Sequence, residues 1–375
     1  MDYRVLLIEN SRIMLERLKN IIQSTKEFSL AASYRTPEEA LGQGGVFKPH
    51  LILLDVEKEE NIASIPAFRD AFPGVSLICL CNRWNAEYAS RLVKAGAQGY
   101  LIKPFSGKEL VTAVTTFGKS GMGIASKSIA FFSPKGKSGK TTLIANLAMS
   151  LAQKSGESVG IIDADSQFGD MAVFFNLNSK STIVEAVRDI KFLSPITLNS
   201  YFQPVNDSVR VLCGTKRPEF AELIDTKGFT EMLKMAQSLF RYVLVDLPPA
   251  FNPLSIAACE ATDETYMVAM VSGGFEIQHM QQAIEIFKDW ADYQERLKII
   301  FTRVEPCDSA AQAELEEELE YPVAAILPNE YLLVSTAAND GRMALDIKPD
   351  SALTHKINRL ADKIIGRSHI RWDKP

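Results

Sequence analysis

The chain has 375 residues, more than a single hydrophobic core usually organises, so two domains are expected. Hydrophobic residues make up 46% and charged residues 23%, a balance typical of globular proteins and unlike that of disordered chains. The formal net charge of −5 argues against an electrostatic grip on nucleic acid as the main function. The N-terminal stretch MDYRVLLIEN has only a short apolar run, so we expect neither a signal peptide nor a membrane span and predict a cytoplasmic protein.

The five cysteines form no Cys-x-x-Cys pair and have no histidine at metal-ligand spacing. The sequence therefore supports neither a disulfide framework nor a zinc site. We expect core thiols at Cys79, Cys81, Cys213, Cys259 and Cys307.

The first third of the chain alternates β-rich runs with amphipathic segments. Continuous apolar runs suited to buried parallel strands are YRVLLI from residue 3, LILLD from 51, VSLICLC from 75 and GYLI from 99. The segment SRIMLERLKNII and another near residues 107–117 are predicted to be helices. Residues 1–118 should therefore form a five-stranded, doubly wound α/β domain with its chemistry at the carboxyl ends of the strands.

Polar residues follow three of these strands: Glu9 and Asn10, then Asp55, then Lys103. With these residues the segment resembles a response-regulator receiver domain, which has a flavodoxin-like fold. In that family an acidic pair binds Mg²⁺, an aspartate accepts a phosphoryl group and a lysine contacts it. The resemblance assigns the acceptor position to Asp55 and the lysine position to Lys103.

The segment departs from the receiver pattern at the other positions. Glu9 is longer than the usual aspartate, Asn10 has no charge to hold a hard cation, and Cys81 or Asn82 replaces the expected hydroxyl residue. Phosphorylation needs the metal as much as the acceptor. We therefore interpret this receiver pseudo-site as part of an adaptor module, with a phosphorylation switch as the alternative.

Residues 119–127 are rich in glycine, serine and lysine and are predicted to link the first domain to a second at 128–375. The second domain opens with the strand SIAFFS, the loop PKGKSG and a helix at 141–154, the context of a phosphate-binding loop. Backbone N–H groups of such a loop surround phosphate oxygens at a helix N-terminus. The expected nucleotide-binding residues of the loop are Lys135, Gly136, Lys137, Ser138, Gly139, Lys140, Thr141 and Thr142.

Two further predicted strands end in acidic residues. VGIIDAD carries Asp163 and Asp165, and YVLVDLPP carries Asp246, where a carboxylate can hold the water shell of a metal. Thr141, Asp163 and Asp246 are therefore the expected Mg²⁺ site. Together with the loop, these strand ends predict a P-loop NTPase domain of three layers, doubly wound around a mainly parallel sheet.

Residues 128 to about 366 resemble a deviant Walker A ATPase of the ParA/MinD class, whose mark is an early lysine in the loop, here Lys135. The resemblance implies ATP and Mg²⁺ as cofactors and a homodimer in which Lys135 reaches the partner's nucleotide. It implies that Lys140 serves the chain's own nucleotide and that Asp165 orients the attacking water. These three residues are the expected catalytic set.

Some residues depart from this class. Lys137 and Pro134 stand where relatives have glycine, so ATP binding should survive better than hydrolysis, which we expect to be slow or absent. The Lys137 side chain is expected to be solvated and not to contact phosphate. The resemblance places Thr302, Arg303 and Pro328 near the adenine, and Thr302 stands where relatives commonly have asparagine. The sequence leaves open whether the chain is an enzyme.

A receiver-like module joined to this ATPase resembles the TadZ/CpaE group. The segments DADSQFGDMAVFFNL, GTKRPEFAELI and LPNEYLLVSTAANDGR are similar to segments of that group. The resemblance covers nearly the whole chain and implies a protein that positions the tight-adherence (Flp) pilus assembly and secretion machinery. The implied partners are a second copy of the chain and either pilus assembly proteins or a polar hub protein, at a cell pole or the inner face of the membrane.

Two other classes stay open. A DNA-partition ATPase would need a basic patch that the composition does not indicate, so no specific nucleic acid partner is expected. A MinD-like membrane-associated regulator would use a terminal amphipathic helix, and residues 355–372 have an apolar face with basic residues beside it. The simpler expectation is that this helix packs on the sheet of its own domain.

Overall fold

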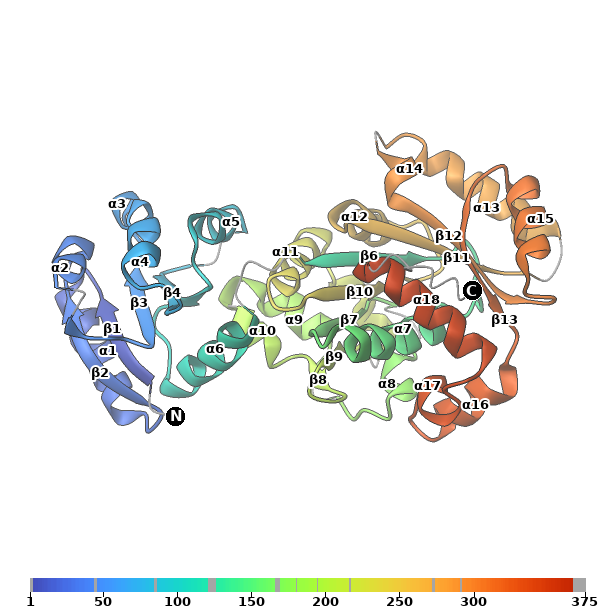
Figure 1. The fold of residues 1–375 in the computed structure, drawn as a ribbon. Helices are drawn as coiled ribbons and strands as arrows, with labels where there is room; N and C mark the ends of the chain where they lie inside the picture. Colours follow the sequence, from blue (N-terminus) through green and yellow to red (C-terminus); the bar gives the residue numbers. More distant parts are fainter. Residues whose placement is uncertain are drawn as a thin grey trace, which may run out of the picture. The chain divides into compact units, whose positions relative to one another are not determined.

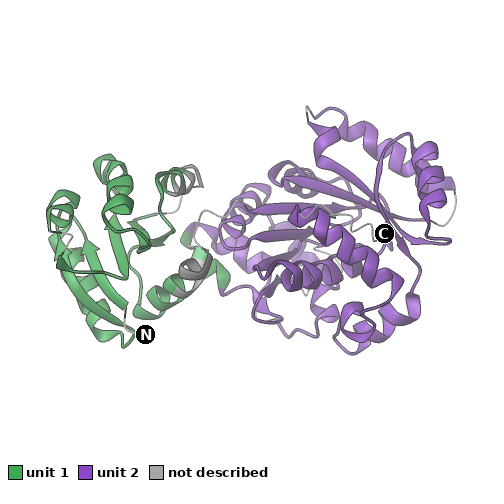
Figure 2. Ribbon diagram, in the orientation of Figure 1, with its two compact units in different colours: residues 1–125, 192–199 green, residues 126–191, 200–375 purple. Residues whose placement is uncertain are grey.

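The structure is a computed structural model that describes residues 3–43, 46–83, 86–120, 126–165, 169–179, 181–193, 195–215, 217–271, 274–290 and 292–366. The chain divides into two compact units, residues 1–125 with 192–199 and residues 126–191 with 200–375 (Figure 2). Helix α6 ends at Ser120 and strand β6 begins at Lys127, so both elements reach into the predicted linker, and 121–125 lie outside the described residues. The grouping of residues 192–199 with the first unit has no counterpart in the predicted boundaries.

The first unit contains a five-stranded parallel sheet in the order β2-β1-β3-β4-β5. This is the predicted doubly wound sheet. Strand β2 lies at one edge of it, and no apolar run in the sequence had predicted this strand. The strands are β1 Tyr3–Ile8, β2 Phe28–Tyr34, β3 Leu51–Asp55, β4 Ser76–Cys81 and β5 Gly99–Ile102. The helices are α1 Arg12–Ser24, α2 Pro37–Gly42, α3 Glu59–Ala63, α4 Ile65–Ala71, α5 Ala86–Ala95, α6 Gly107–Ser120 and α10 Pro195–Asn199.

Helices cover both faces of this sheet (Figure 1). α1 contacts α6, whereas α4 contacts α2 and α3, and α3 contacts α5. Residues 5–8 of β1 and 51–54 of β3 are almost completely buried, which explains their continuous apolar sequences. Because the strands are parallel, Glu9, Asp55 and Lys103 come to the same edge of the sheet.

The second unit contains an eight-stranded sheet in the order β13-β12-β11-β6-β10-β7-β9-β8, in which only the β8–β9 pair is antiparallel. The strands are β6 Lys127–Phe132, β7 Val159–Asp163, β8 Gln203–Pro204, β9 Val209–Leu212, β10 Tyr242–Asp246, β11 Glu264–Met270, β12 Leu297–Val304 and β13 Val323–Pro328. The α-helices are α7 Lys140–Ser155, α8 Met171–Phe174, α9 Ile183–Asp189, α11 Thr226–Gln237, α12 Pro253–Ala261, α13 Gly274–Phe287, α14 Tyr293–Arg296, α15 Ser309–Leu319, α16 Tyr331–Asn339, α17 Ala344–Ile347 and α18 Ala352–Ile365. Short 3₁₀ turns are η2 Ile190–Phe192 and η3 Pro218–Leu223.

Three neighbouring strands at the centre of this sheet position the predicted site. β10 lies between β6 and β7, and Asp246 is in register with Phe131 on one side and Asp163 on the other. The loop after β6 leads directly into α7, which packs against β7 and β10. The phosphate-binding loop and the two acidic strand ends therefore meet at one edge of the sheet.

The C-terminal helix α18 uses its apolar face inside the second unit. It packs on α7 and β13, where Ile357, Leu360 and Ala361 are buried. Asp362 pairs with Lys154 of α7 at 2.8 Å between carboxylate oxygen and ammonium nitrogen. The helix was expected to pack on its own domain, and it does. The apolar face of its described part is therefore not available to bind a membrane. Within the described ranges, no helix is long and apolar enough to cross a membrane.

Candidate nucleotide site and receiver pseudo-site

The phosphate-binding loop presents two buried polar residues at the N-terminus of α7. Ser138 and Lys140 are almost completely buried, whereas Lys135, Gly136 and Lys137 are exposed. The first backbone N–H groups of a helix have no partner inside it and, with the helix dipole, favour an anion. The loop therefore combines free amide donors with the buried Lys140 ammonium, as phosphate binding requires.

Thr141 and Asp246 meet beside Lys140. The Thr141 hydroxyl donates to Asp246 Oδ2 at 2.7 Å, and Lys140 Nζ lies 3.9 Å from Asp246 Oδ1. Burial raises the pKa of the Asp246 carboxyl to about 6, although the Lys140 charge and the Thr141 hydrogen bond both lower it. Asp246 is therefore mostly ionised at neutral pH and adds a negative charge beside the phosphate-binding loop.

A nucleotide and Mg²⁺ fit the residues present. Asp246 Oδ1 and Ser138 Oγ are buried and have no hydrogen-bond partner among the described residues, which is costly unless a ligand supplies one. Hydroxyl and carboxylate oxygens are hard ligands of the type Mg²⁺ prefers. Within the described residues no group of three or more His, Cys, Asp or Glu side chains could hold a metal by itself. Mg²⁺ would thus be shared between this pair and the phosphates, its usual mode in nucleotide sites.

Asp163, the third expected metal residue, is completely buried and bound by backbone amides. Its Oδ1 accepts from the Asp165 N–H at 3.2 Å and its Oδ2 from the Met171 N–H at 3.3 Å. Burial raises its pKa well above the usual value, and the charges of Asp246 and Asp165 add to this effect. A Cβ atom at Gly169 would lie 2.5 Å from Asp163 Oδ2, so only glycine permits this close approach. These contacts make Asp163 the organiser of the backbone that presents Asp165.

The residues expected near the adenine line one pocket of the second unit. Thr302, Arg303 and Pro328 lie together there with Gly139 of the loop and the largely exposed Tyr331. Thr142, Leu143, Leu327, Asn329, Glu330, Val334, Leu353 and Ile357 complete the lining. The sequence prediction thus grouped residues that the fold does bring together beside the phosphate-binding loop.

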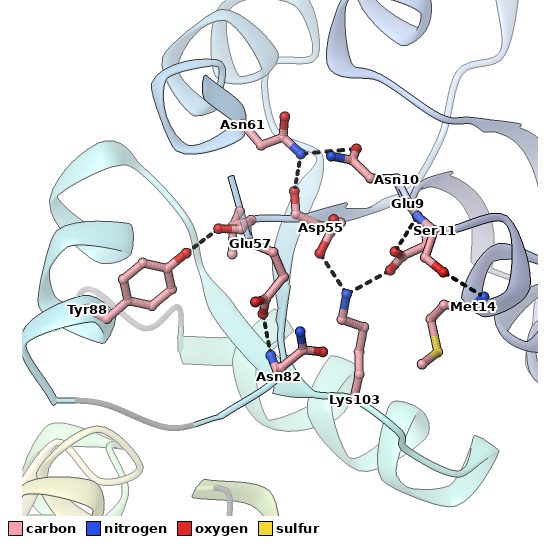
Figure 3. Close-up of polar contacts among 11 residues, drawn as sticks. Glu9, Asn10, Ser11, Met14, Asp55, Glu57, Asn61, Asn82, Tyr88 and Lys103 are labelled. Atoms are coloured by element: carbon pink, nitrogen blue, oxygen red, sulfur yellow. Dashed lines mark hydrogen bonds and ion pairs between the residues drawn. The ribbon is translucent and has the colours of Figure 1, made fainter. Parts of the chain in front are cut away.

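The receiver pseudo-site is built around Lys103 (Figure 3). Its ammonium nitrogen lies 2.7 Å from Asp55 Oδ1 and 2.9 Å from Glu9 Oε2, and all three residues are at most 7% exposed. Burial lowers the pKa of Lys103, but the hydrogen bonds to Asp55 and Glu9 outweigh burial and raise it overall. Asn61 donates to the Asp55 carbonyl at 2.8 Å and to Asn10 Oδ1 at 3.3 Å.

A divalent metal does not fit this pseudo-site. The Lys103 ammonium already binds both carboxylates, and Glu9 Oε1 accepts from the Ser11 N–H at 3.0 Å. Asn10 brings an amide where a second carboxylate would be needed, and that amide is bonded to Asn61. At the end of β4, burial raises the pKa of the Cys81 thiol to about 12, so the thiol stays neutral.

Comparisons with known proteins match each unit separately. Residues 5–115 match the family described as the response regulator receiver domain, and residues 126–299 match the AAA domain. Curated regulatory proteins match the receiver part, and the chain spans 56% and 50% of the length of two of them, at 31% and 28% identity. An uncharacterized ATP-binding protein of Methanocaldococcus jannaschii is 27% identical over 248 residues, which are 64% of this chain and 88% of that protein.

Solved structures match the second unit. A ParA family ATPase from Chlorobium tepidum TLS superposes with a TM-score of 0.59 at 20% identity, covering 63% of this chain and 99% of that one. The septum site-determining protein MinD from Pyrococcus horikoshii OT3, complexed with Mg-ADP, gives a TM-score of 0.54 at 20% identity, covering 64% and 96%. The chain joins a receiver domain to a P-loop domain with the ParA/MinD fold. Both predicted fold classes are confirmed.

The P-loop of this second domain is strained at one lysine. Lys137 has φ of +64°, in the left-handed region that favours glycine, and Gly139 has φ of +82°. In this region the backbone conformation of a residue with a Cβ atom is less favourable by roughly 1 kcal/mol or more. The unusual lysine noted in the sequence therefore stands at a position whose backbone conformation suits glycine.

Relative to the same change at Lys135, replacing Lys137 with glycine is expected to raise the free energy of unfolding of the P-loop domain by about 1 kcal/mol, because the strain is removed. Lys135→Gly is the matched control, since Lys135 does not have a positive φ and glycine there only adds freedom to the unfolded chain. Urea unfolding followed by circular dichroism measures both changes. Equal destabilisation by the two substitutions would show that the Lys137 backbone carries no relievable strain.

Sequence reasoning missed several contacts of the receiver domain. Asn61 was not identified, although it joins the loop after β1 to the end of β3. Glu57 accepts from the Asn82 N–H at 2.5 Å, and the Tyr88 hydroxyl donates to the Val56 carbonyl. These residues come from loops and from helices α3 and α5, and no motif in the sequence predicts their contacts. They join the segments around Asp55 to one another.

Proposed function

We propose that this protein is a dimeric, Mg-ATP-binding positioning protein of the TadZ/CpaE type. It localises the tight-adherence (Flp) pilus assembly and secretion machinery, recruited to a cell pole or the inner face of the membrane. The observation that carries the nucleotide part is a pair of buried oxygens without hydrogen-bond partners among the described residues, Ser138 Oγ and Asp246 Oδ1, beside the buried Lys140. The names of the relatives, an ATP-binding protein and a MinD complexed with Mg-ADP, support the same ligands.

Each residue has a defined task in this proposal. Lys140, the Ser138 hydroxyl and the free amides at the start of α7 hold the phosphates. Thr141 and Asp246 hold Mg²⁺, which when bound neutralises charge on the phosphates. Asp165, positioned through its amide by Asp163, orients the attacking water. Turnover is slow in this proposal, because Lys137 and Pro134 stand where relatives of this class have glycine.

The receiver domain serves as an adaptor in this proposal. Its acceptor position, Asp55, is buried in an ion pair with Lys103, and the pseudo-site does not fit a metal. The surfaces of a receiver domain can bind a partner protein without a phosphorylation switch. The implied partner is a pilus assembly or secretion protein, or a polar hub protein.

ATP-dependent dimerisation tests the proposal. Lys135 is exposed on the loop, as a residue that contacts a partner's nucleotide must be. Lys135→Ala is therefore expected to weaken ATP-dependent dimerisation by about tenfold or more while monomer binding of ATP changes little. Sedimentation velocity with a nonhydrolysable ATP analogue measures the first and calorimetry the second. A parent chain that stays monomeric with saturating ATP would contradict the dimeric switch.

A further inference from the structure

Thr302 contacts the phosphate-binding loop from a strand two positions away in the sheet. Its hydroxyl donates to the Ser138 carbonyl at 2.7 Å, and the residue is 6% exposed. A Cβ atom at Gly139 would lie 3.4 Å from Thr302 Oγ1 and 3.7 Å from its Cβ, so the Thr302 side chain packs directly against the loop backbone. This contact connects β12 to Ser138 and Gly139, the two residues that precede α7.

A local irregularity of β12 accompanies this contact. The pairing of β12 with β13 shifts register between Phe301 and Val304, and Arg303 has φ of +57°. Bulges of this kind redirect side chains and are common next to active sites. Here Thr302 is buried under the loop while Arg303 is exposed, with one guanidinium nitrogen 3.0 Å from the sulfur of Met270.

Because of peptide geometry, the contact with the Ser138 carbonyl also sets the direction of the Gly139 N–H. In a trans peptide the C=O of one residue and the N–H of the next point in opposite directions. When Thr302 holds the Ser138 carbonyl, the Gly139 N–H is directed away from β12. We propose that Thr302 is a positioning residue for the phosphate-binding loop, which fixes the Ser138–Gly139 peptide so that its N–H is available to a phosphate. This inference rests on the proposed nucleotide function.

The same contact limits what the Thr302 hydroxyl can donate to a base. A threonine hydroxyl has a single proton, and the nearest acceptor is the Ser138 carbonyl, with the Ala269 carbonyl farther away at 3.4 Å. That proton is therefore not available to a ring nitrogen of adenine. Thr302 acts on whatever phosphate chain the loop binds, whichever base is attached.

The test compares Thr302→Val with Thr302→Ser, using calorimetry with Mg-ATP, Mg-GTP and inorganic tripolyphosphate. Valine has the shape of threonine without the donor, so affinity for all three probes should fall by the same factor, roughly tenfold for one lost hydrogen bond. Serine keeps the donor and should restore binding of all three. Where the valine variant does not fold, Thr302→Ala compared with Thr302→Ser still isolates the hydroxyl, and melting curves without nucleotide report their folding.

Three outcomes would overturn the inference. If the valine variant loses ATP affinity while tripolyphosphate affinity is unchanged, Thr302 affects binding through the nucleoside and not through the loop. Parental affinity for all three probes in the valine variant would show that the Thr302 contact has no positioning role. A parent chain that binds none of the probes would contradict the proposed nucleotide function itself, and this inference with it.

Discussion

Replacement of Lys140 with alanine is expected to weaken Mg-ATP binding by about 2 to 5 kcal/mol, roughly thirtyfold to several thousandfold in Kd. The Lys140 ammonium is buried at the start of α7, where it is screened little by water. Without it, the phosphates would lie beside the ionised Asp246 carboxylate, whose Oδ1 is 3.9 Å from the lysine nitrogen, with Mg²⁺ as the remaining buried cation. Calorimetry with Mg-ATP measures the loss.

Lys154→Ala is the matched control for Lys140→Ala. Both lysines belong to α7, but Lys154 lies in the last turn and pairs with Asp362 of α18. Its replacement should lower stability slightly, because a partly exposed ion pair contributes little, and leave the Kd for ATP unchanged. Equal ATP affinity in the parent and the Lys140→Ala variant would show that this loop is not the phosphate-binding site.

The sequence predicted the fold well where a single physical rule decides the pattern. Buried parallel strands need apolar residues on both faces, so the runs at 3–8, 51–55 and 242–246 coincide with β1, β3 and β10. Strand β2 was harder, since FSLAASY lies at a sheet edge with mostly half-buried residues and has no continuous apolar run. The grouping of residues 192–199 with the first unit depends on tertiary contacts that no local pattern encodes.

The sequence predicted which residues lie together at the candidate site, but it did not predict the hydrogen bonds between them. Residues at strand ends could be assigned because parallel strands bring their carboxyl ends to one edge. The hydrogen bond from Thr302 to Ser138 lies beside a register shift in the β12–β13 pairing, and the hydrogen bonds from backbone N–H groups to Asp163 accompany the close approach of Gly169. Such contacts join segments far apart in the sequence, and only the folded backbone decides which donor meets which acceptor.

The strand ends of the receiver domain are joined by a buried ion cluster. A buried carboxylate is stable only with a compensating charge, and the cluster has two carboxylates, Glu9 and Asp55, for one ammonium, Lys103. Hydrogen-bond donors compensate part of the excess negative charge, among them the Ser11 backbone N–H, which binds Glu9. The Lys103 ammonium therefore compensates the charge of both buried carboxylates.

Replacement of Lys103 with methionine is accordingly expected to destabilise the receiver domain by about 3 kcal/mol or more, because it leaves two buried carboxylates without a cation. Hydrogen exchange of the full chain measures this locally: amides of β3 should exchange at least a hundredfold faster, since 1.4 kcal/mol corresponds to a factor of ten. Amides of β10 in the P-loop domain serve as the internal reference and should not change. Lys108→Met is the control, because Lys108 lies in the same unit, on α6, and is exposed.

A second substitution separates the electrostatic cause from a loss of packing. Asp55→Asn removes one of the two stranded charges and keeps the shape of the side chain, so adding it to Lys103→Met should recover part of the lost protection in β3. In the parent background the same Asp55→Asn change removes a partner of the buried ammonium and should destabilise. If Asp55→Asn lowers protection equally in both backgrounds, the two side chains are not coupled, and the ion cluster is not what holds this edge of the receiver domain together.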